Sequence, residues 1–188
     1  MARFAGRSAL ARDERGQGLV EFALILPVLL LILVGIIEFG SVYSKVISMR
    51  QGVREAGRQG SVANWGTIPP SCTLTGVPIG TSAQIKALMC LAKDQAGVGD
   101  SARFKVRYAN STLSSYGDDA GLYQVGNAIV ICAIYPLQSL TGLIQPFLGG
   151  KAAKTKAAFR IEKAPNAGAL TPGGESPPSG QNWNSCGP

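Results

Sequence analysis

An acidic residue just inside an apolar run is the feature of this sequence best placed to do chemistry. Several arginines are followed by Gly16-Gln-Gly-Leu-Val-Glu21-Phe22, which leads directly into the run. An ionisable group inside a bilayer costs about 2.5 to 3.5 kcal/mol on insertion scales, so by default it marks a function. Cutting the chain after Gly16 would create an α-amine on Gln17. That amine is a ready counter-charge for Glu21.

The same cut places Glu21 at the fifth position of the shortened chain, about 6 Å along a helix axis from its own amine. In a staggered array of helices, the carboxylate of one subunit could meet the amine of the next. Three alternatives stay open. Gly18 is a second candidate scissile glycine, a free Gln17 could cyclise and lose its charge, and Glu21 of an uncut chain could snorkel to the interface.

The apolar run from 19 to 39 predicts a helix that spans a membrane. Its 21 residues contain two ionisable groups, Glu21 and Glu38, and at 1.5 Å per residue they extend roughly 31 Å, the thickness of a hydrocarbon core. The helical pattern continues past Gly40, so removal of the run as a secretory signal is not expected. Pro27 should kink this helix rather than end it.

Cysteine usage favours one orientation of the chain across the membrane. Basic residues flank the apolar run on both sides, so the positive-inside rule gives little preference for either orientation. The cysteines are even in number, follow the run and match no close metal-ligand spacing: they are Cys72, Cys90, Cys132 and Cys186. We therefore expect a cytoplasmic N-terminus and an oxidising, extracytoplasmic location for the rest. Of the three possible pairings we favour Cys72 with Cys90 and Cys132 with Cys186.

The remaining pattern predicts an α+β fold in which the long N-terminal helix continues into a small domain. A loop over 64–80 should precede a second helix ending near Ala96, with Thr81 and Gln84 as a capping box. Apolar alternation or β-branched runs over 102–109, 127–135 and 151–163 predict strands, with a short helical turn over 137–148. We expect a mainly antiparallel sheet of three to four strands.

This pattern divides the chain into four parts. Residues 1–16 form a leader, 17–60 the transmembrane and extended helix, and 61–163 the extracytoplasmic α+β domain. Residues 164–188 are rich in Pro, Gly, Ser and Asn. That composition predicts a flexible tail without a packed core, except where Cys186 tethers it.

Two rows of residues recur at helical spacing after the apolar run. Small residues at every fourth position would let another helix or the chain's own domain approach closely, unless they reflect chance in a Gly- and Ala-rich chain: they are Gly40, Ser44, Ser48, Gly52, Ala56 and Gly60. Arg50, Arg54 and Arg58 form the second row. Like charges so spaced weaken a helix unless lipid headgroups or an acidic partner face them, and a solvated face is an equal alternative.

The spacing G-x-x-x-x-E-F before an apolar segment resembles the type IV prepilin processing site. The stretch RGQGLVEFALILPVLLLILVGIIEFG is similar to the TadE-like minor pilins, or pseudopilins, of tight-adherence (Flp-type, type IVb) pilus systems. This resemblance implies cleavage between Gly16 and Gln17, packing through Glu21 and Phe22, and a role in assembling an adhesive pilus. The implied partners are a prepilin peptidase, other pilins and pseudopilins, and the inner-membrane assembly platform. The implied location is the bacterial inner membrane, and the pilus filament is an alternative location.

Nothing in the sequence points to an enzyme. The chain has no histidine, which removes the Ser-His-Asp and Cys-His arrangements and the commonest metal ligand. P-loop and dinucleotide fingerprints are missing, and Asp118-Asp119 are typical turn residues. We expect no cofactor, metal or small-molecule substrate.

The competing hypothesis is a signal-anchored envelope protein whose basic head binds nucleic acid or an envelope polymer. Residues 151–163 carry five basic side chains and one acidic side chain, which is the charge pattern that such binding needs. A solvated strand face explains the same residues more simply, and nucleic acid is not the expected partner.

Overall fold

The computed structural model describes residues 16–163 and 168–187. Most of the expected leader, 1–16, therefore lies outside the described residues, as do 164–167 of the expected tail. The chain divides into two compact units, 1–39 and 40–188. We refer to the second unit as the head.

Helix α1, Gln17–Ser61, confirms the long N-terminal helix and contains Pro27 without ending there. Apolar side chains of its first part are exposed, among them Leu24 at 73% and Leu31 at 73%. Within the part of the chain that the structure describes, α1 is the one helix long and apolar enough to cross a membrane. The most apolar stretch of α1 has no buried residues. A surface of this kind is unfavourable in water and suits lipid or neighbouring helices.

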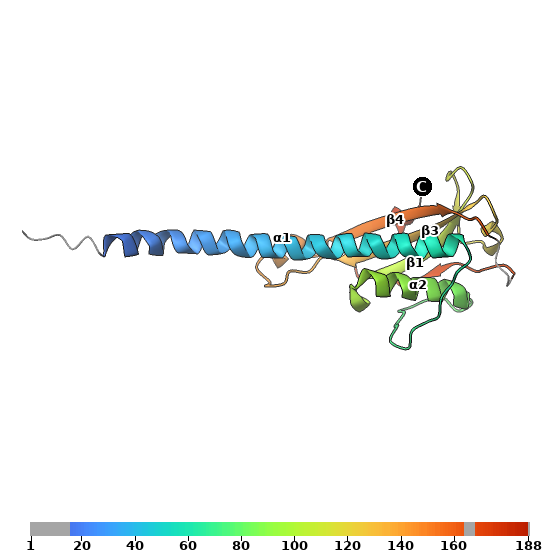
Figure 1. Cartoon of the computed structure of the whole chain (residues 1–188), viewed down its shortest axis with the longest axis horizontal. Coiled ribbons are helices and arrows are strands. Elements are labelled where there is room, and N and C mark those ends of the chain that lie inside the picture. Colours follow the sequence, from blue (N-terminus) through green and yellow to red (C-terminus); the bar gives the residue numbers. More distant parts are fainter. Residues whose placement is uncertain (1–15, 164–167, 188) are drawn as a thin grey trace, which may run out of the picture. The chain divides into compact units, whose positions relative to one another are not determined.

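The head contains α2 (Ala83–Ala96), β1 (Arg103–Ala109), β2 (Tyr116–Gly117), β3 (Ala128–Pro136), α3 (Gln145–Leu148), β4 (Ala152–Arg160) and β5 (Gly173–Gly174), with three short 3-10 turns. The strand order is β2-β1-β3-β4, with β5 also pairing with β1. Figure 1 labels the three longer strands, β1, β3 and β4. Every pairing is antiparallel. The α+β fold is confirmed, and the two short strands bring the sheet to five.

Strand β3 is buried along almost its whole length because both faces of the sheet are covered. On one face, side chains of the second part of α1 and of α2, such as Val53 and Leu88, pack against Val106 and Ile131. On the other face, Cys186 and Trp183 from the C-terminal segment pack against Val130 and Cys132. A strand covered on both faces needs apolar side chains at successive positions, which explains the run that predicted it.

The capping box expected at the start of α2 is wrong. The N-cap residue is Ser82, and its side chain makes no capping hydrogen bond. The Ser82 hydroxyl instead accepts a hydrogen bond from the N–H of Thr171 at 2.9 Å, and the Ser82 N–H donates to the Thr171 carbonyl at 3.2 Å. A distant backbone segment has therefore replaced the local cap, which sequence spacing alone does not reveal.

The tail also differs from the flexible segment expected over 164–188. Residues 168–187 pack on the head: β5 pairs with β1, and Leu170 and Glu175 are buried. A ladder of backbone hydrogen bonds, a buried ion pair and the tether at Cys186 stabilise a segment with few apolar side chains. The amino-acid composition of the segment does not reveal these interactions.

Candidate functional site

The expected cleavage site lies where α1 begins. Gly16 is exposed and sits in a turn, and α1 starts at the next residue, Gln17. The Gly16 carbonyl accepts a hydrogen bond from the Val20 N–H at 3.2 Å, so it is the first acceptor of the helix. Among the described residues, apart from chain neighbours and the backbone of the helix itself, no heavy atom lies within 4 Å of where a Cβ would stand at Gly16 or at Gly18.

Glu21 and Phe22 lie in the second turn of α1, on its apolar part. Both side chains are exposed, and large apolar neighbours on the same part are exposed as well, including Leu19 at 71%. A carboxylate set among exposed apolar side chains is placed for contacts in a membrane or with other helices.

The row of small residues is used unevenly. Gly52, Ala56 and Gly60 are buried, whereas Gly40 and Ser44 are exposed and Ser48 is half-buried. A side chain at Gly52 would stand 2.8 Å from the Cβ of Ala96, and one at Gly60 would stand 2.8 Å from Ile129 Cδ1. The C-terminal half of the row thus lets α1 pack closely on α2 and the sheet. Its other half, from Gly40 to Ser44, remains open.

The arginine row meets one carboxylate from its own helix. The guanidinium of Arg58 contacts Glu55 at 2.8 Å, and the side-chain amide of Gln59 also donates to it at 2.8 Å. These hydrogen bonds, with that from Arg58 the stronger, lower the pKa of Glu55 from 4.5 to about 2. Among the described residues no acidic side chain lies within 4.0 Å of Arg50 or Arg54.

The structure joins Cys72 to Cys90 and Cys132 to Cys186, the two pairs favoured among the three possible. The first bond fastens the loop after α1 to α2, and the second fastens the C-terminal segment to the centre of the sheet. No cysteine is left free, so the thiol chemistry of a nucleophile is not available while both bonds are formed.

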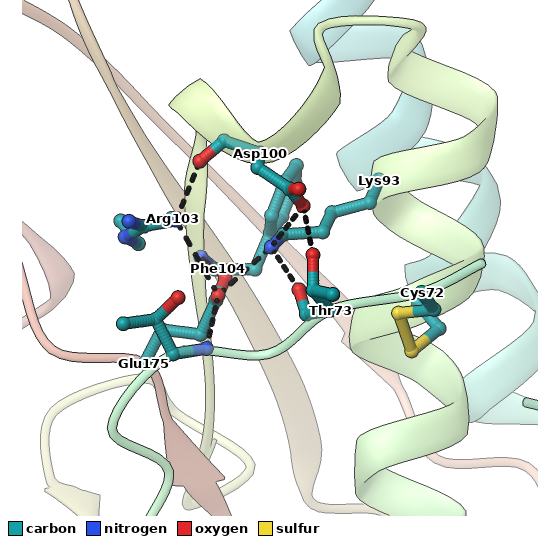
Figure 2. Close-up of a disulfide and its surroundings, with 9 residues drawn as sticks. Cys72, Thr73, Lys93, Asp100, Arg103, Phe104 and Glu175 are labelled. Carbon is teal, nitrogen blue, oxygen red and sulfur yellow. Dashed lines mark hydrogen bonds and ion pairs between the residues drawn. A yellow bond between two sulfur atoms is a disulfide. The ribbon is translucent and has the colours of Figure 1, made fainter. Parts of the chain in front are cut away.

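A buried ion pair, which sequence reasoning missed, lies beside the first disulfide (Figure 2). Lys93 of α2 and Glu175 of the C-terminal segment are 7% and 2% exposed. The Lys93 ammonium donates to Glu175 Oε1 at 2.8 Å and to the Thr73 carbonyl at 2.6 Å. A third oxygen, Asp100 Oδ1, lies 3.6 Å away.

The Glu175 carboxylate is equally well provided with donors. It accepts hydrogen bonds from the backbone N–H of Thr75 at 3.0 Å and of Phe104 at 2.9 Å, and Arg103 Nη1 lies 3.8 Å away. This cluster joins the loop after α1, α2, β1 and the C-terminal segment. Because every charge has partners, it is a structural lock rather than a site for proton transfer.

One local signal for this lock was present in the sequence. Lys93 follows Met89 by one helical turn and so lies on the apolar stripe of α2, where a solvated lysine would not be expected. Its partner lies 82 residues further along the chain, and nothing local points to it.

The aspartates that sequence analysis assigned to a turn have structural roles. Asp119 accepts a hydrogen bond from the Gly121 N–H at 2.8 Å, and Asp118 pairs with Arg107 at 2.9 Å and with Lys105 at 3.2 Å. Within 16–163 and 168–187, no cluster of three His, Cys, Asp or Glu side chains could hold a metal ion.

Residues 16–58 match the family of TadE-like proteins, which confirms the resemblance of this segment. The match begins at the expected scissile glycine and includes most of α1. No curated protein and no solved structure matches the chain significantly. The family suggests involvement in tight-adherence pilus systems, partners among pilus components and a non-enzymatic role, and the single N-terminal apolar helix suggests membrane anchoring.

Proposed function

Given that residues 16–58 carry the TadE-like sequence, we propose that this chain is a minor pilin, or pseudopilin, needed to assemble a Flp-type adhesive pilus. A prepilin peptidase cleaves it after Gly16. It is held in the bacterial inner membrane by α1, with the head outside the cytoplasm. The observation that carries the proposal is the coincidence, within the matched segment, of an exposed glycine at the start of a helix and a glutamate five positions later.

Position on the helix favours Gly16 over Gly18 as the scissile residue. A protease needs an extended, accessible peptide bond. The bond after Gly16 lies at the boundary of α1, whereas Gly18 lies within its first turn. Cleavage after Gly16 would release the one helical hydrogen bond that its carbonyl accepts from Val20, whereas cleavage after Gly18 would require more of the first turn to unwind, at the cost of further backbone hydrogen bonds.

Cleavage would give Glu21 a role between subunits. The new α-amine of Gln17 and the Glu21 carboxylate lie on neighbouring turns of one helix. When helices stagger in an array, the amine of one subunit comes level with the carboxylate of another. In a medium of low dielectric constant their attraction is strong, and it fixes the relative height of the two helices. Phe22 and the other exposed apolar side chains add contact area without fixing height.

The two disulfides support an extracytoplasmic head. Such bonds persist in the bacterial periplasm and are rare in the reducing cytoplasm. With the head outside, the leader and its arginines are on the cytoplasmic side. The partners of this proposal are the peptidase, the other pilins and pseudopilins of the system, and the inner-membrane assembly platform.

Intact-mass measurement of the protein from cells with and without a prepilin peptidase tests the proposal. We expect the chain to lack residues 1–16 when the peptidase is present and to begin at residue 1 or 2 when it is absent. Further loss of one ammonia would show that Gln17 has cyclised. A chain that keeps residues 1–16 in both strains would end the pilin assignment, and a chain beginning at Leu19 would move the cut to Gly18.

A further inference from the structure

Strand β4 forms an open edge of the sheet. In the part of the chain that the structure describes, its backbone pairs with β3 alone. The other edge of the sheet differs, since β1 is covered on its outer side by β2 and β5. The outward N–H and C=O groups of β4 are thus a template on which a further strand can form.

A groove runs along this edge, between β4 and the outer side of α1. One hollow of about 280 Å³ is lined by Arg50 and Arg54 of α1 and by Thr155, Lys156 and Ala157 of β4. A second, of about 530 Å³, shares Arg54 and Ala157 and adds Phe159. We call these six residues the β4 groove. Its floor is apolar, at Ala157 and Phe159, and its α1 side is cationic.

The positive charge of the groove is not neutralised by the head. Arg50 and Arg54 are exposed, and no described acidic side chain lies within 4.0 Å of either. Glu55 also lines the second hollow, but its carboxylate is held by Arg58 and Gln59. Two unpaired guanidinium groups beside a free strand edge match a ligand with carboxylates on an extended backbone.

We propose that the β4 groove docks an extended acidic segment of a second protein. The segment adds to β4 as a strand, and every second side chain, on the α1 side of the sheet, brings a carboxylate to Arg50 or Arg54 beside Ala157 and Phe159. Affinity then comes from backbone hydrogen bonds and selectivity from charge. This docking is independent of Gly16 and Glu21, so it goes beyond the function proposed for α1.

Charge argues against a second copy of this chain as the occupant. The chain carries a net charge of +7. Pairing of β4 with β4 of a second copy would bring Lys154, Lys156 and Arg160 close to the same residues of the other chain. Like charges across a strand pair are destabilising, so the basic residues of β4 oppose self-pairing and admit an acidic strand.

Synthetic peptides test the proposal on the full chain in detergent micelles. The probe is an octapeptide of alternating Glu and Val. One comparator replaces Glu with Lys, and a second keeps the Glu/Val sequence but is N-methylated throughout, which preserves charge and removes the backbone donors. Titration calorimetry gives the affinities, and amide hydrogen exchange locates the bound peptide.

We expect the Glu/Val peptide to bind and to slow exchange at alternate amides of β4. N-methylation should weaken binding about tenfold or more, and the Lys/Val peptide should not bind. The double variant R50E/R54E should lose binding to a similar extent. The variant K86E/K163E is the matched control, because it changes the net charge equally at residues that line neither hollow, and its affinity should stay within about twofold.

Three results would overturn the proposal. Equal affinity for the methylated and unmethylated acidic peptides would show general attraction to a basic protein rather than strand addition. Undiminished binding by R50E/R54E, with an unchanged thermal unfolding temperature to show that this variant is folded, would remove the groove as the site. Protection of β4 without any peptide, accompanied by dimerisation, would make a second copy the occupant.

Discussion

Glu21 and Glu175 are two carboxylates in apolar parts of the molecule, and their surroundings differ completely. Glu175 is 2% exposed, and its charge is met by Lys93 and by two backbone N–H groups. Glu21 is exposed on a helix whose apolar side chains are also exposed. The head therefore encloses Glu175 among its own donors, whereas Glu21 is exposed among the exposed apolar side chains of the first part of α1.

The same contrast holds along the row of small residues on α1. Gly52 lies against the backbone and side chains of α2, whereas the space around Gly40 is open. One sequence pattern thus serves two purposes. Its second half builds the head, and its first half is available to other molecules. Substitutions at buried positions of the row, such as Gly52, should accordingly change the stability of the head, whereas substitutions at exposed positions of α1 should leave that stability nearly unchanged.

The largest effect is expected from Glu175→Ala. This change leaves the Lys93 ammonium buried without its counter-ion and two backbone N–H groups without acceptors, which should lower the free energy of unfolding by about 3 to 5 kcal/mol. Denaturant unfolding of the full chain in detergent measures it. Asp118→Ala, at a half-exposed ion pair with Arg107 and Lys105, is the control and should cost about 1 kcal/mol or less. Equal losses for the two variants would contradict the lock.

A smaller effect is expected when a methyl group is added at the two glycines. Gly52→Ala should destabilise the head by about 1 to 3 kcal/mol, because the new Cβ overlaps Ala96 in a packed core. Gly40→Ala should leave the head intact or stabilise α1 by up to about 1 kcal/mol, since alanine favours the helix. Parallel denaturant unfolding compares them. If Gly52→Ala were as stable as Gly40→Ala, the close packing of α1 on α2 would be wrong.

The smallest effect concerns Glu55. Its folded-state pKa of about 2 lies below the ordinary value of 4.5, so its ionised form adds stability above pH 4.5 that is lost as the pH falls towards 2. The pair with Arg58 is exposed, and the contribution should be slight and screened by salt. Unfolding of the wild type and Glu55→Gln across this pH range should show a difference that shrinks with acid. A difference that grows instead would mean that the carboxyl is stabilised in its neutral form.

The sequence predicts those parts of the molecule that local periodicity controls. The apolar run of α1, the stripe of α2 and the alternation of β1 each carry their own signal, and β3 reveals its burial through successive β-branched side chains. The disulfide pairing could be predicted because four cysteines allow only three pairings.

What the sequence did not reveal depends on residues far apart in the chain. Glu175 meets Lys93 across 82 residues, and Ser82 bonds Thr171 across 89, so neither the lock nor the docked C-terminal segment has a local signal. The β4 groove likewise arises because folding brings the arginine row of α1 beside Ala157 of β4. Taken alone, the arginine row of α1 and the basic residues of β4 each have the pattern of a solvated face.

The most direct measurement of the central claim is the amount of Glu21→Ala protein that enters assembled pili, relative to the amount held in the inner membrane. Glu162→Ala, which removes an exposed carboxylate from the head, is the control. We predict that Glu21→Ala inserts normally and keeps the unfolding free energy of the head, but is lost from sheared pili or abolishes them, while Glu162→Ala behaves as wild type. Normal pili with normal incorporation of Glu21→Ala would contradict the role of this carboxylate between subunits.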